Sequence, residues 1–366
     1  MRVRDVCAAV EDLAPLDWAY SWDHAGLNIG DPAAPVERVL VALSVTEDVL
    51  AAARRRKAQM IVSHHPIIWD PLKALRTDNP GTRLCIELAH AGIACYSAHT
   101  NLDICPGGLN ELLAERLGLV HSKPLLQVAH ARQVKLVTFV PETHLAEVRR
   151  AVCGAGAGVV GEYVQCSFSA PGVGTFMPGN KAQPFSGRRR RLNEAPERRF
   201  EVLAPKALIN QIVAALKKAH PYEETAYDLV TLENTDPAVA LGRRGNLPNA
   251  ATLDDFAQDV RRRLRLSHVR VVGKGDRLIR TAAVIGGSGG GDVASMPGDV
   301  DVLVTGDVGY HDALTAEQRG LALVDAGHAG TEQFAVPLLA GHLRKHFKHL
   351  RVSTYAEPEL FRALSE

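Results

Sequence analysis

Two neighbouring histidines stand where an apolar run of this sequence stops. Residues 61–69 read IVSHHPIIW, with His64 and His65 placed between Ser63 and Pro66. Imidazole nitrogens bind borderline divalent metal ions, so this stretch is a candidate metal site. Because neighbouring side chains of an extended segment point to opposite faces, the two rings are expected to point apart. They would then bind two different ions, or one would bind an ion while the other packs in the core.

The second candidate stretch is AHTNLD at residues 98–103, which follows a predicted strand. It offers His99 and Asp103 in a loop just beyond the end of that strand. The structural alternative for Asp103 is a turn or a helix cap ahead of Pro106. A carboxylate in this position is also what a bridging metal ligand requires.

The third stretch is DAGHAGTE at residues 325–332, where a Gly-rich turn leads from a predicted strand into a helix. His328 and Glu332 are four residues apart, so they share one helix face if the helix begins early. The alternative is structural: Thr331 caps the helix, and Glu332 interacts favourably with the helix dipole.

The fourth stretch is TGDVGYHDAL at residues 305–314, which contains Asp307, His311 and Asp312 after a predicted strand. His311 is a candidate for a metal ligand, for a partner that orients a ligand, or for a general acid or base. The alternative is the exposed start of a surface helix.

Taken together, four separate stretches each place a histidine or a carboxylate beyond the end of a predicted strand. Structural explanations for all four at once are less plausible than for any one of them. Histidines combined with carboxylates suit two borderline metal ions better than calcium, which prefers oxygen ligands. Two ions ~3.5–4 Å apart hold a substrate oxygen and acidify a bound water. The sequence therefore predicts a two-metal site.

The elements that must position these stretches alternate between strand and helix in the first and last thirds of the chain. This rhythm predicts an α/β domain with a mainly parallel sheet and helices on its faces, and ligands bind at the carboxyl ends of such strands. The predicted strands are residues 37–44, 59–63, 92–97, 279–286, 300–305, 321–325 and 350–355, and the predicted helices are residues 46–57, 82–91, 108–117, 309–318 and 331–347.

The middle third has a different pattern, strand-helix-strand-strand-helix-strand, which is typical of a ferredoxin-like α+β domain. We therefore predict one α/β domain formed by residues 1–124 and 246–366, interrupted by an inserted domain at residues 125–245. The predicted elements of the insertion are residues 132–140, 142–153, 162–168, 198–204, 206–219 and 226–232.

The composition is that of a globular protein of the cytoplasm. Apolar residues make up 46% of the 366 residues and charged residues 23%, and this length predicts two domains. The net charge of +1 disfavours nucleic acid or a membrane as a partner. Charged residues near the N-terminus argue against a signal peptide, and no apolar run approaches the ~20 residues that span a bilayer. Six cysteines without CxxC spacing predict reduced thiols.

Three further motifs give weaker signals. The stretch GGSGGGD at residues 286–292 is read as a flexible loop, with a phosphate-binding loop as the alternative. The run Arg188–Arg191 is read as a solvated turn rather than a nucleic-acid patch. The stretch HPYEE at residues 220–224 is read as a helix stop at Pro221, with an ion site as the alternative.

Several of these motifs together resemble one family. SHHPIIW at residues 63–69, AHTNLD at residues 98–103 and AGHAGTE at residues 326–332 are similar to the GTP cyclohydrolase I type 2 homologue family, also called the interacting-factor-three-like dinuclear metal-centre proteins. WDHAGLNIGD at residues 22–31 and AHPYEETAYDL at residues 219–229 extend the resemblance along the chain. The departure is at residues 327–332, which read GHAGTE where members often carry an aromatic residue after the histidine.

The resemblance implies a metal site with a defined set of ligands. It implies two metal ions per chain, with Asp103 as the natural bridge. Three histidines and two carboxylates suit zinc, iron, manganese, cobalt or nickel, and His99 or His311 is a candidate for proton transfer or for orienting ligands. The ligands that it implies are His64, His65, Asp103, His328 and Glu332.

The resemblance also carries expectations about assembly and activity. It implies a CutA-like or PII-like insertion and a homohexamer. It further implies a metal-dependent hydrolase that acts on a nucleotide such as GTP. The alternative function is a non-enzymatic metal-binding or regulatory assembly, because no residue stands out as a dedicated nucleophile.

Overall fold

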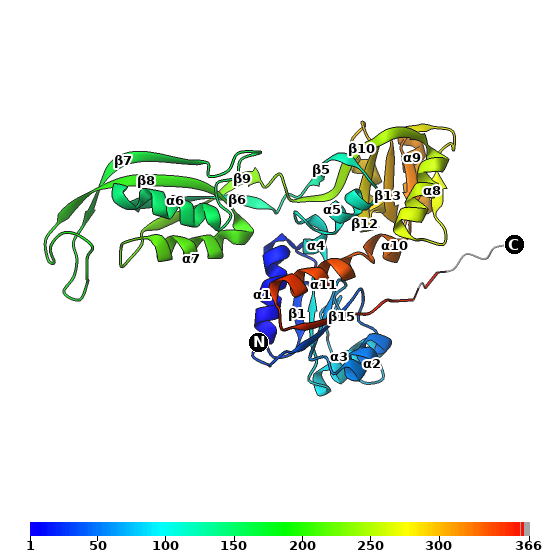
Figure 1. Ribbon diagram of the computed structural model, residues 1–366, viewed down its shortest axis with the longest axis horizontal. Helices are drawn as coiled ribbons and strands as arrows, with labels where there is room; N and C mark the ends of the chain where they lie inside the picture. Colours follow the sequence, from blue (N-terminus) through cyan, green and yellow to red (C-terminus); the bar gives the residue numbers. More distant parts are fainter. Residues whose placement is uncertain (359, 362–366) are drawn as a thin grey trace. The chain divides into compact units, whose positions relative to one another are not determined.

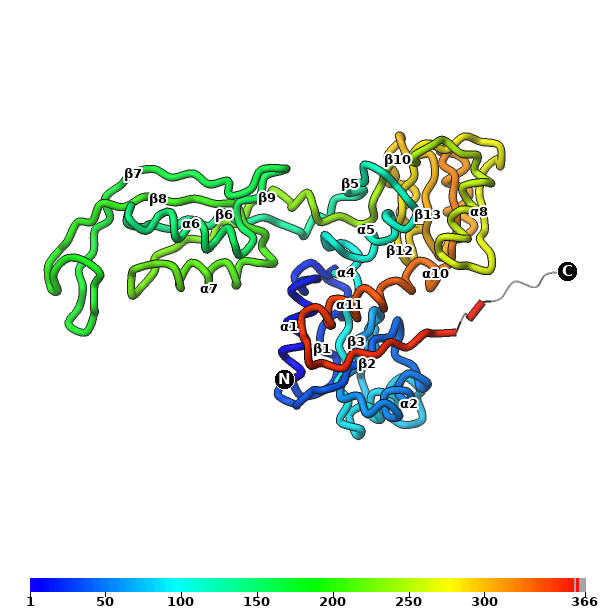
Figure 2. Tube along the Cα trace, viewed as in Figure 1, coloured from blue at the N-terminus to red at the C-terminus, as the bar shows by residue number. Residues whose placement is uncertain are grey.

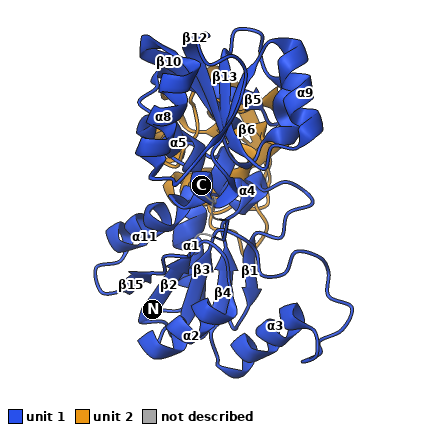
Figure 3. Ribbon diagram, turned by 90° about the vertical axis from the view of Figure 1, so that its right-hand side faces the viewer, with its two compact units in different colours: residues 1–128, 238–366 blue, residues 129–237 orange. Residues whose placement is uncertain are grey.

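The computed structural model describes residues 1–358, 360 and 361, and the chain divides into two compact units. Unit 1 comprises residues 1–128 and 238–366, and unit 2 comprises residues 129–237 (Figure 3). Strands β5 (Val120–Gln127) and β10 (Ala240–Thr252) flank unit 2 in the sequence and pair antiparallel with each other in unit 1. The insertion therefore begins and ends at neighbouring points of one sheet, and part of the segment predicted as insertion, residues 125–245, belongs to unit 1.

Unit 1 is a mixed α/β structure with two sheets. The first sheet has the strand order β1-β4-β3-β2-β15, in which β1 is antiparallel to β4 and the other neighbours are parallel. β3 and β4 are buried along their whole length, as expected of strands covered on both faces. The strands of this sheet are β1 (Gly26–Ile29), β2 (Arg38–Ala42), β3 (Met60–Ser63), β4 (Ala94–Ser97) and β15 (Arg351–Thr354).

Helices cover both faces of this first sheet (Figure 1). One core cluster joins Leu40 and Ile61 of the sheet to Leu50 and Leu88 of two helices, α2 (Glu47–Arg56) and α3 (Pro80–His90). The hydroxyl of Thr46 accepts a hydrogen bond from the Val49 amide and so caps the predicted helix α2.

The other helices of the first sheet lie against β2 and β15 or against each other. α1 (Val3–Leu13) packs on α11 (Ala335–His346), and α11 packs on β2 and β15. The segment predicted as one helix at residues 331–347 is divided into α10 (His328–Glu332) and α11. α10 therefore begins earlier than expected, at His328 itself.

The second sheet of unit 1 has the strand order β11-β14-β13-β12-β10-β5. Only its centre, β12-β13-β14, is parallel, and the outer pairs are antiparallel. The mainly parallel sheet predicted from the sequence therefore describes the first sheet better than the second. The remaining strands are β11 (Arg270–Val272), β12 (Leu278–Ser288), β13 (Val302–Gly306) and β14 (Ala322–Asp325).

Short and long helices surround this second sheet (Figure 2). α4, α5 and α8 contact β10, while α9 contacts β14 and α10 contacts β12 and β13. Their bounds are α4 (Thr100–Ile104), α5 (Leu109–Arg116), α8 (Leu253–Leu264) and α9 (Tyr310–Arg319), with the 3-10 helices η1 (Leu16–Trp18) and η4 (Gly290–Ser295).

Unit 2 is one antiparallel sheet with two helices packed on one of its faces. Its strand order is β7-β8-β6-β9, and its elements follow the order strand-helix-strand-strand-helix-strand along the chain. Leu136, Phe200 and Ile212 belong to the core cluster between sheet and helices. The elements are β6 (Arg132–Val140), η2 (Glu142–His144), α6 (Leu145–Gly154), β7 (Ser167–Phe176), β8 (Asn193–Pro205), η3 (Lys206–Leu208), α7 (Ile209–Ala219) and β9 (Tyr227–Thr235).

Two predictions about the bulk of the chain can be compared with the structure. All six cysteines are free thiols, and four of them are buried. Within the described part of the chain, we find no helix that combines the length and apolar character needed to cross a bilayer.

Candidate metal centre

Two parallel strands from each sheet of unit 1 end at the candidate site. His64 and His65 follow β3, and His99 follows β4, in the first sheet. Asp307 follows β13, and His328 comes shortly after β14, in the second sheet. Contacts between these groups, described below, bring the carboxyl ends of the two sheets together. The sequence prediction that ligands gather at strand ends agrees with this arrangement.

His64 and His65 converge, although the alternation of side chains along a strand predicts that they point apart. The extended segment ends at Ser63, and the amides of both histidines donate to the carbonyl of Leu43. The chain bends there, so the alternation of a strand no longer applies. The two ring centroids are 5.1 Å apart. Both imidazoles therefore face the same site.

Glu332 is the carboxylate on which three imidazoles meet. It is only 3% exposed, and its Oε2 lies 2.8 Å from His65 Nε2 and 2.9 Å from His328 Nε2. Its Oε1 lies 3.5 Å from His64 Nε2. Because α10 begins at His328, Glu332 is one helical turn further on and shares its face, as the sequence pattern required.

His64, His65 and Glu332 form a group that could hold a metal ion. Their ligand atoms all lie within 4.8 Å of one another. The Nδ1 of His64 lies 2.7 Å from the carbonyl oxygen of Ala98. Since a carbonyl oxygen can only accept a hydrogen bond, Nδ1 carries the proton and donates it. This hydrogen bond leaves Nε2 as the nitrogen that faces the carboxylates, the arrangement usual for metal-binding imidazoles.

Asp103 completes the buried part of the site from α4, a short helix where a loop was expected. Its Oδ1 lies 3.6 Å from His64 Nε2, and neither atom has a hydrogen-bond partner among the described residues. Buried polar atoms are normally satisfied, so two facing atoms of this kind point to a ligand between them. A nitrogen and an oxygen donor fit a borderline divalent cation.

The pKa values describe a buried site that favours positive charge. Burial acts to lower the pKa of His64, but Asp103 and Glu332 outweigh it and raise this pKa to about 9. Burial also acts to raise the pKa of Glu332, but contact with His64 and His328 lowers it well below its usual range. Burial raises the pKa of Asp103 to about 6. A cation placed among these groups would take over the role of the proton on His64.

His328 is held by a second carboxylate, Asp307. Its Nδ1 lies 2.7 Å from Asp307 Oδ2, and hydrogen bonding to Glu332 is the main reason that its pKa rises to about 9. Asp307 has a positive φ of 53°, a conformation that is rare for residues other than glycine and that recurs at functional sites. Asp307 therefore orients the ring of His328.

We expect Asp307→Asn to weaken metal binding about 10–100-fold, the usual effect of losing a carboxylate behind a metal-binding histidine. Asparagine accepts the left-handed conformation, so the backbone should not change. A competition titration against a chromophoric chelator measures the affinity. Asp312→Asn in the same segment is the control, and equal affinities of the two variants would contradict the assigned role of Asp307.

His99 lies beside the group but is bound to a carboxylate of its own. Its Nδ1 is 2.9 Å from Asp23 Oδ1, and its ring centroid is 5.4 Å from that of His64. Burial acts to raise the pKa of Asp23, yet hydrogen bonds from His99 and Thr100 lower it. Asp23 is thus ionised and fixes the orientation of His99.

Two exposed indole rings stand next to His99. Trp22 and Trp69 are each 55% exposed, and their ring centroids are 6.0 Å apart. The ring of Trp69 lies 5.4 Å from that of His99, and the ring of Trp22 lies 6.1 Å from it. Large exposed aromatic surface of this kind is characteristic of a binding surface.

His311, the other predicted proton-transfer residue, has no described contact with the group. It is exposed on α9, and its ring contacts Tyr310. The residue of this segment that reaches the site is Asp307. Asp23 and Asp307 were not predicted as partners of His99 and His328, although Asp23 lies in the motif WDHAGLNIGD and Asp307 in TGDVGYHDAL.

The Gly-rich stretch at residues 286–292 was expected to be a flexible loop, but its residues belong to β12 and η4 and support the site. The amides of Gly286, Gly287 and Gly289 donate to Asn110, Thr331 and Thr305. Gly287 has a φ of +68°, and an added Cβ would lie 2.1 Å from Glu332 Oε1. Glycine here makes room for the carboxylate.

We expect Gly287→Ala to displace Glu332 and to lower metal affinity by about tenfold or more, within the range known for residues that orient ligands. The left-handed backbone also costs about 1–2 kcal/mol with alanine, so the Tm should fall. Gly291→Ala is the matched control, because a Cβ at that position meets nothing within 4 Å. Metal content and Tm measure both effects, and a Gly287→Ala protein that matches the control would contradict the packing argument.

Comparison with known proteins places the chain among relatives of similar length. The family model described as Duf34/NIF3 (NGG1p interacting factor 3) matches residues 1–358. A protein of Halalkalibacterium halodurans named GTP cyclohydrolase 1 type 2 homolog is 41% identical over 319 residues, which is 87% of this chain and 86% of that protein. A Bacillus subtilis protein of the same name is 40% identical over 320 residues, again 87% and 86% of the two chains.

A solved structure agrees with these matches over the entire chain. The crystal structure of a Bacillus cereus protein related to NIF3 superposes with a TM-score of 0.86 at 36% identity and covers 100% of this chain and 99% of the other. The structure of a Staphylococcus aureus protein superposes with a TM-score of 0.72 at 27% identity, with the same coverage.

Proposed function

This chain belongs to the Duf34/NIF3 family, and we propose that it is a dinuclear-metal-binding hydrolase that acts on a nucleotide. The observation that carries the proposal is the group His64, His65 and Glu332, in which His64 and Glu332 are buried and all ligand atoms lie within 4.8 Å of one another. The name GTP cyclohydrolase 1 type 2 homolog, which the relatives carry, supports a nucleotide as the substrate.

The five predicted ligands divide into two sets that share Glu332. His64 and Asp103 lie on one side of it, and His65 and His328 lie on the other, with their Nε2 atoms 3.3 Å apart. Glu332 would therefore be a ligand in both sets, whereas the resemblance assigned the bridging role to Asp103. Zinc, iron, manganese, cobalt and nickel all suit this donor set.

Bound divalent ions would supply Lewis acidity and a lowered pKa for a water molecule. The protein itself would supply the proton acceptor: His99, whose Nδ1 is held by ionised Asp23, presents its other nitrogen as a base. Since His64, Asp103 and Glu332 are buried, the site also limits access of bulk water.

The indoles of Trp22 and Trp69 support a planar heterocycle as the substrate. A base that stacks on an aromatic side chain typically gains ~1–3 kcal/mol. Both rings contact His99, so a stacked base would lie beside the candidate base and the metal ligands. We therefore assign recognition of the nucleobase to this pair of rings.

The test is a nucleotide-hydrolysis screen on protein that carries its native metal. We expect GTP or a related nucleotide to be turned over, and Trp69→Ala to raise KM about tenfold because stacking is lost. Metal content of this variant should equal that of the parent. Protein that holds metal but turns over no nucleotide would contradict the proposal and favour the alternative, a metal-binding or regulatory assembly.

The remaining expectations are part of the same proposal. We propose that unit 2 is a ferredoxin-like domain of the CutA or PII type, which its strand-helix-strand-strand-helix-strand order supports. We further propose a homohexamer located in the cytoplasm. Free cysteines are compatible with that location.

A further inference from the structure

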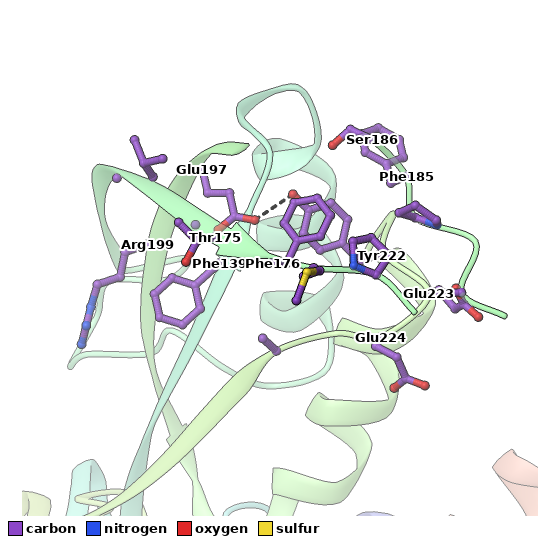
Figure 4. Close-up of a pocket in the computed structure, with 18 of the residues that line it drawn as sticks. Phe139, Thr175, Phe176, Phe185, Ser186, Glu197, Arg199, Tyr222, Glu223 and Glu224 are labelled. Carbon is purple, nitrogen blue, oxygen red and sulfur yellow. Dashed lines mark hydrogen bonds between the residues drawn. The ribbon is translucent and has the colours of Figure 1, made fainter. Parts of the chain in front are cut away.

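Unit 2 contains a cavity of about 630 Å³ that lies far along the chain from the predicted metal ligands. Ligand pockets typically measure ~300–1,000 Å³. The cavity is lined by residues of β6, β7 and β8, of the loop that joins β7 to β8, and of the segment after α7 (Figure 4). The metal centre makes no use of these residues.

Alternation along the strands explains why the sheet is hollow here. Cross-strand partners share a face, and Phe139 pairs with Arg199, Arg199 with Ala170, and Glu197 with Gly172. These residues face away from the helices, because the neighbouring Phe200 lies in the core beneath them. Small residues on β7 opposite large ones on β6 and β8 leave a depression.

Aromatic rings form the walls of this depression. Phe139 and Phe176 come from the sheet, while Phe185 lies in the β7–β8 loop and is 52% exposed. The ring of Phe185 is 5.8 Å from that of Tyr222, which follows α7. Aromatic rings from three elements therefore surround one space.

The loop that carries Phe185 is held in place by the HPYEE segment at residues 220–224 and by the arginine run at residues 188–191. Neither motif contributes to the metal centre. The Gln183 amide donates to Glu223 of the HPYEE segment at 2.6 Å. In the arginine run, Arg189 donates to the carbonyl of Ala182 at 2.7 Å, and Arg190 donates to Asn180. The run is thus an exposed turn that braces the loop, in agreement with its interpretation as a solvated turn.

His220 of the HPYEE segment is unsuited to an ion. Its Nε2 contacts the Phe139 carbonyl at 3.0 Å, and its Nδ1 accepts from the Tyr222 amide at 3.2 Å. α7 ends at Ala219, before Pro221, so the interpretation as a helix stop agrees with the structure. The segment instead places Tyr222 and two glutamates at the cavity.

The charge of the cavity is negative. Glu197, Glu223 and Glu224 line it, and Arg199 is the only cation among the lining residues. Arg199 donates to Glu201 at 2.7 Å, outside the lining, and extends away from Glu197 in Figure 4. Burial raises the pKa of Tyr222, so its phenol keeps a proton and donates to Glu197 at 2.7 Å.

The absence of a side chain at Gly174 makes room for the carboxylate of Glu197 at the cavity. A Cβ added at Gly174 would lie 2.3 Å from Glu197 Oε2, so the carboxylate lies directly across this strand position. The tyrosine contact uses Oε1, the other oxygen. Glu197 thus has a fixed orientation inside a cavity with aromatic walls.

We propose that this cavity binds a small organic cation, an amine whose ammonium group pairs with Glu197 and whose apolar or aromatic body packs against Phe139, Phe176 and Phe185. Aromatic faces attract cations through their quadrupole, and a carboxylate adds direct charge complementarity. An anionic ligand such as a nucleotide phosphate is disfavoured by the three glutamates. The site is independent of the proposed hydrolysis.

The test uses the full-length protein and three probes of one shape: phenethylammonium, neutral 2-phenylethanol and anionic phenylacetate. We expect saturable binding of phenethylammonium in a calorimetric titration, about tenfold or more tighter than 2-phenylethanol, and no binding of phenylacetate. Glu197→Gln should abolish the preference for the cation. Phe185→Leu, a change in an exposed loop that spares the core, should weaken binding of both phenethylammonium and 2-phenylethanol.

Glu194→Gln is the matched control, because Glu194 also lies on β8 but is not among the residues that line the cavity. It should bind like the parent. Absence of saturable binding, or equal affinity for the cation and the neutral probe, would overturn the proposal. So would sedimentation data showing that Phe185→Leu dissociates an assembly of the parent, since a second copy of the chain would then fill the cavity.

Discussion

Replacing Glu332 by glutamine should remove both metal ions from the protein. Glu332 contacts His64, His65 and His328, and it is the residue through which the two proposed ligand sets meet. The amide carries no charge and turns a donor group toward the imidazoles. We expect the affinity for metal to fall by at least about 100-fold. Loss of a residue that only orients a metal ligand already lowers metal affinity by up to about 100-fold, and loss of a ligand itself should cost more.

Metal analysis of protein purified without added metal measures this effect. Thermal unfolding gives a second readout, because a metal present at 100 times its Kd stabilises the folded state by ~2.7 kcal/mol, and the variant should lose this increment. Glu317→Gln on α9 is the matched control, an exposed glutamate with no described side-chain contact to the site. If Glu332→Gln kept the metal content of the control, Glu332 would not be a ligand.

Asp103→Ala should lower the metal content from two ions per chain to one or none. The unpartnered Oδ1 of Asp103 faces the unpartnered Nε2 of His64, so its removal takes an anion from the most deeply buried part of the site. If Asp103 bridges, as the resemblance implies, both ions should be lost together. If Glu332 alone bridges, one ion should remain with His65 and His328.

Metal content of the parent and the Asp103→Ala variant, before and after reloading, distinguishes these outcomes. Asp103→Asn keeps the shape of the side chain and separates loss of charge from loss of packing. A parent that never holds more than one ion would show that the centre is not dinuclear. An Asp103→Ala protein with two ions would show that Asp103 is no ligand.

Most elements around the site could be predicted because their signals are local. β3 and β14 are short apolar runs that end at polar residues, and Thr46 is a good N-cap for α2. The spacing of His328 and Glu332 carried the information that they share a face, provided that the helix began at His328. These patterns require only neighbours in the sequence.

The partners in the site could not be predicted because they are contacts between distant segments. Asp23 and His99 are separated by 76 residues, and Asp307 and His328 by 21. No periodicity indicates which carboxylate meets which imidazole, and His311 had the more suggestive residue type. The convergence of His64 and His65 depends on a bend at the strand end, which alternation cannot describe.

The division of unit 1 into two sheets also could not be predicted from the alternation of strands and helices in the sequence. Strand and helix alternate across both sheets, so the order of elements gave no signal of where one sheet stops. β10 is antiparallel to both of its neighbours, and its length reflects pairing with β5 on one side and β12 on the other. Such pairing is set by tertiary packing rather than by propensity.

The pairing of β5 with β10 makes the chain modular. Gln127 and Ala240 are register partners, so the polypeptide leaves and re-enters unit 1 at directly opposite positions of an antiparallel ladder. A short turn can join such positions, since antiparallel neighbours need only a tight hairpin. An ancestor without unit 2, or one carrying a different unit, would therefore keep every predicted metal ligand in place. During evolution, a domain could therefore be inserted, lost or replaced between β5 and β10 without any change in the predicted metal ligands.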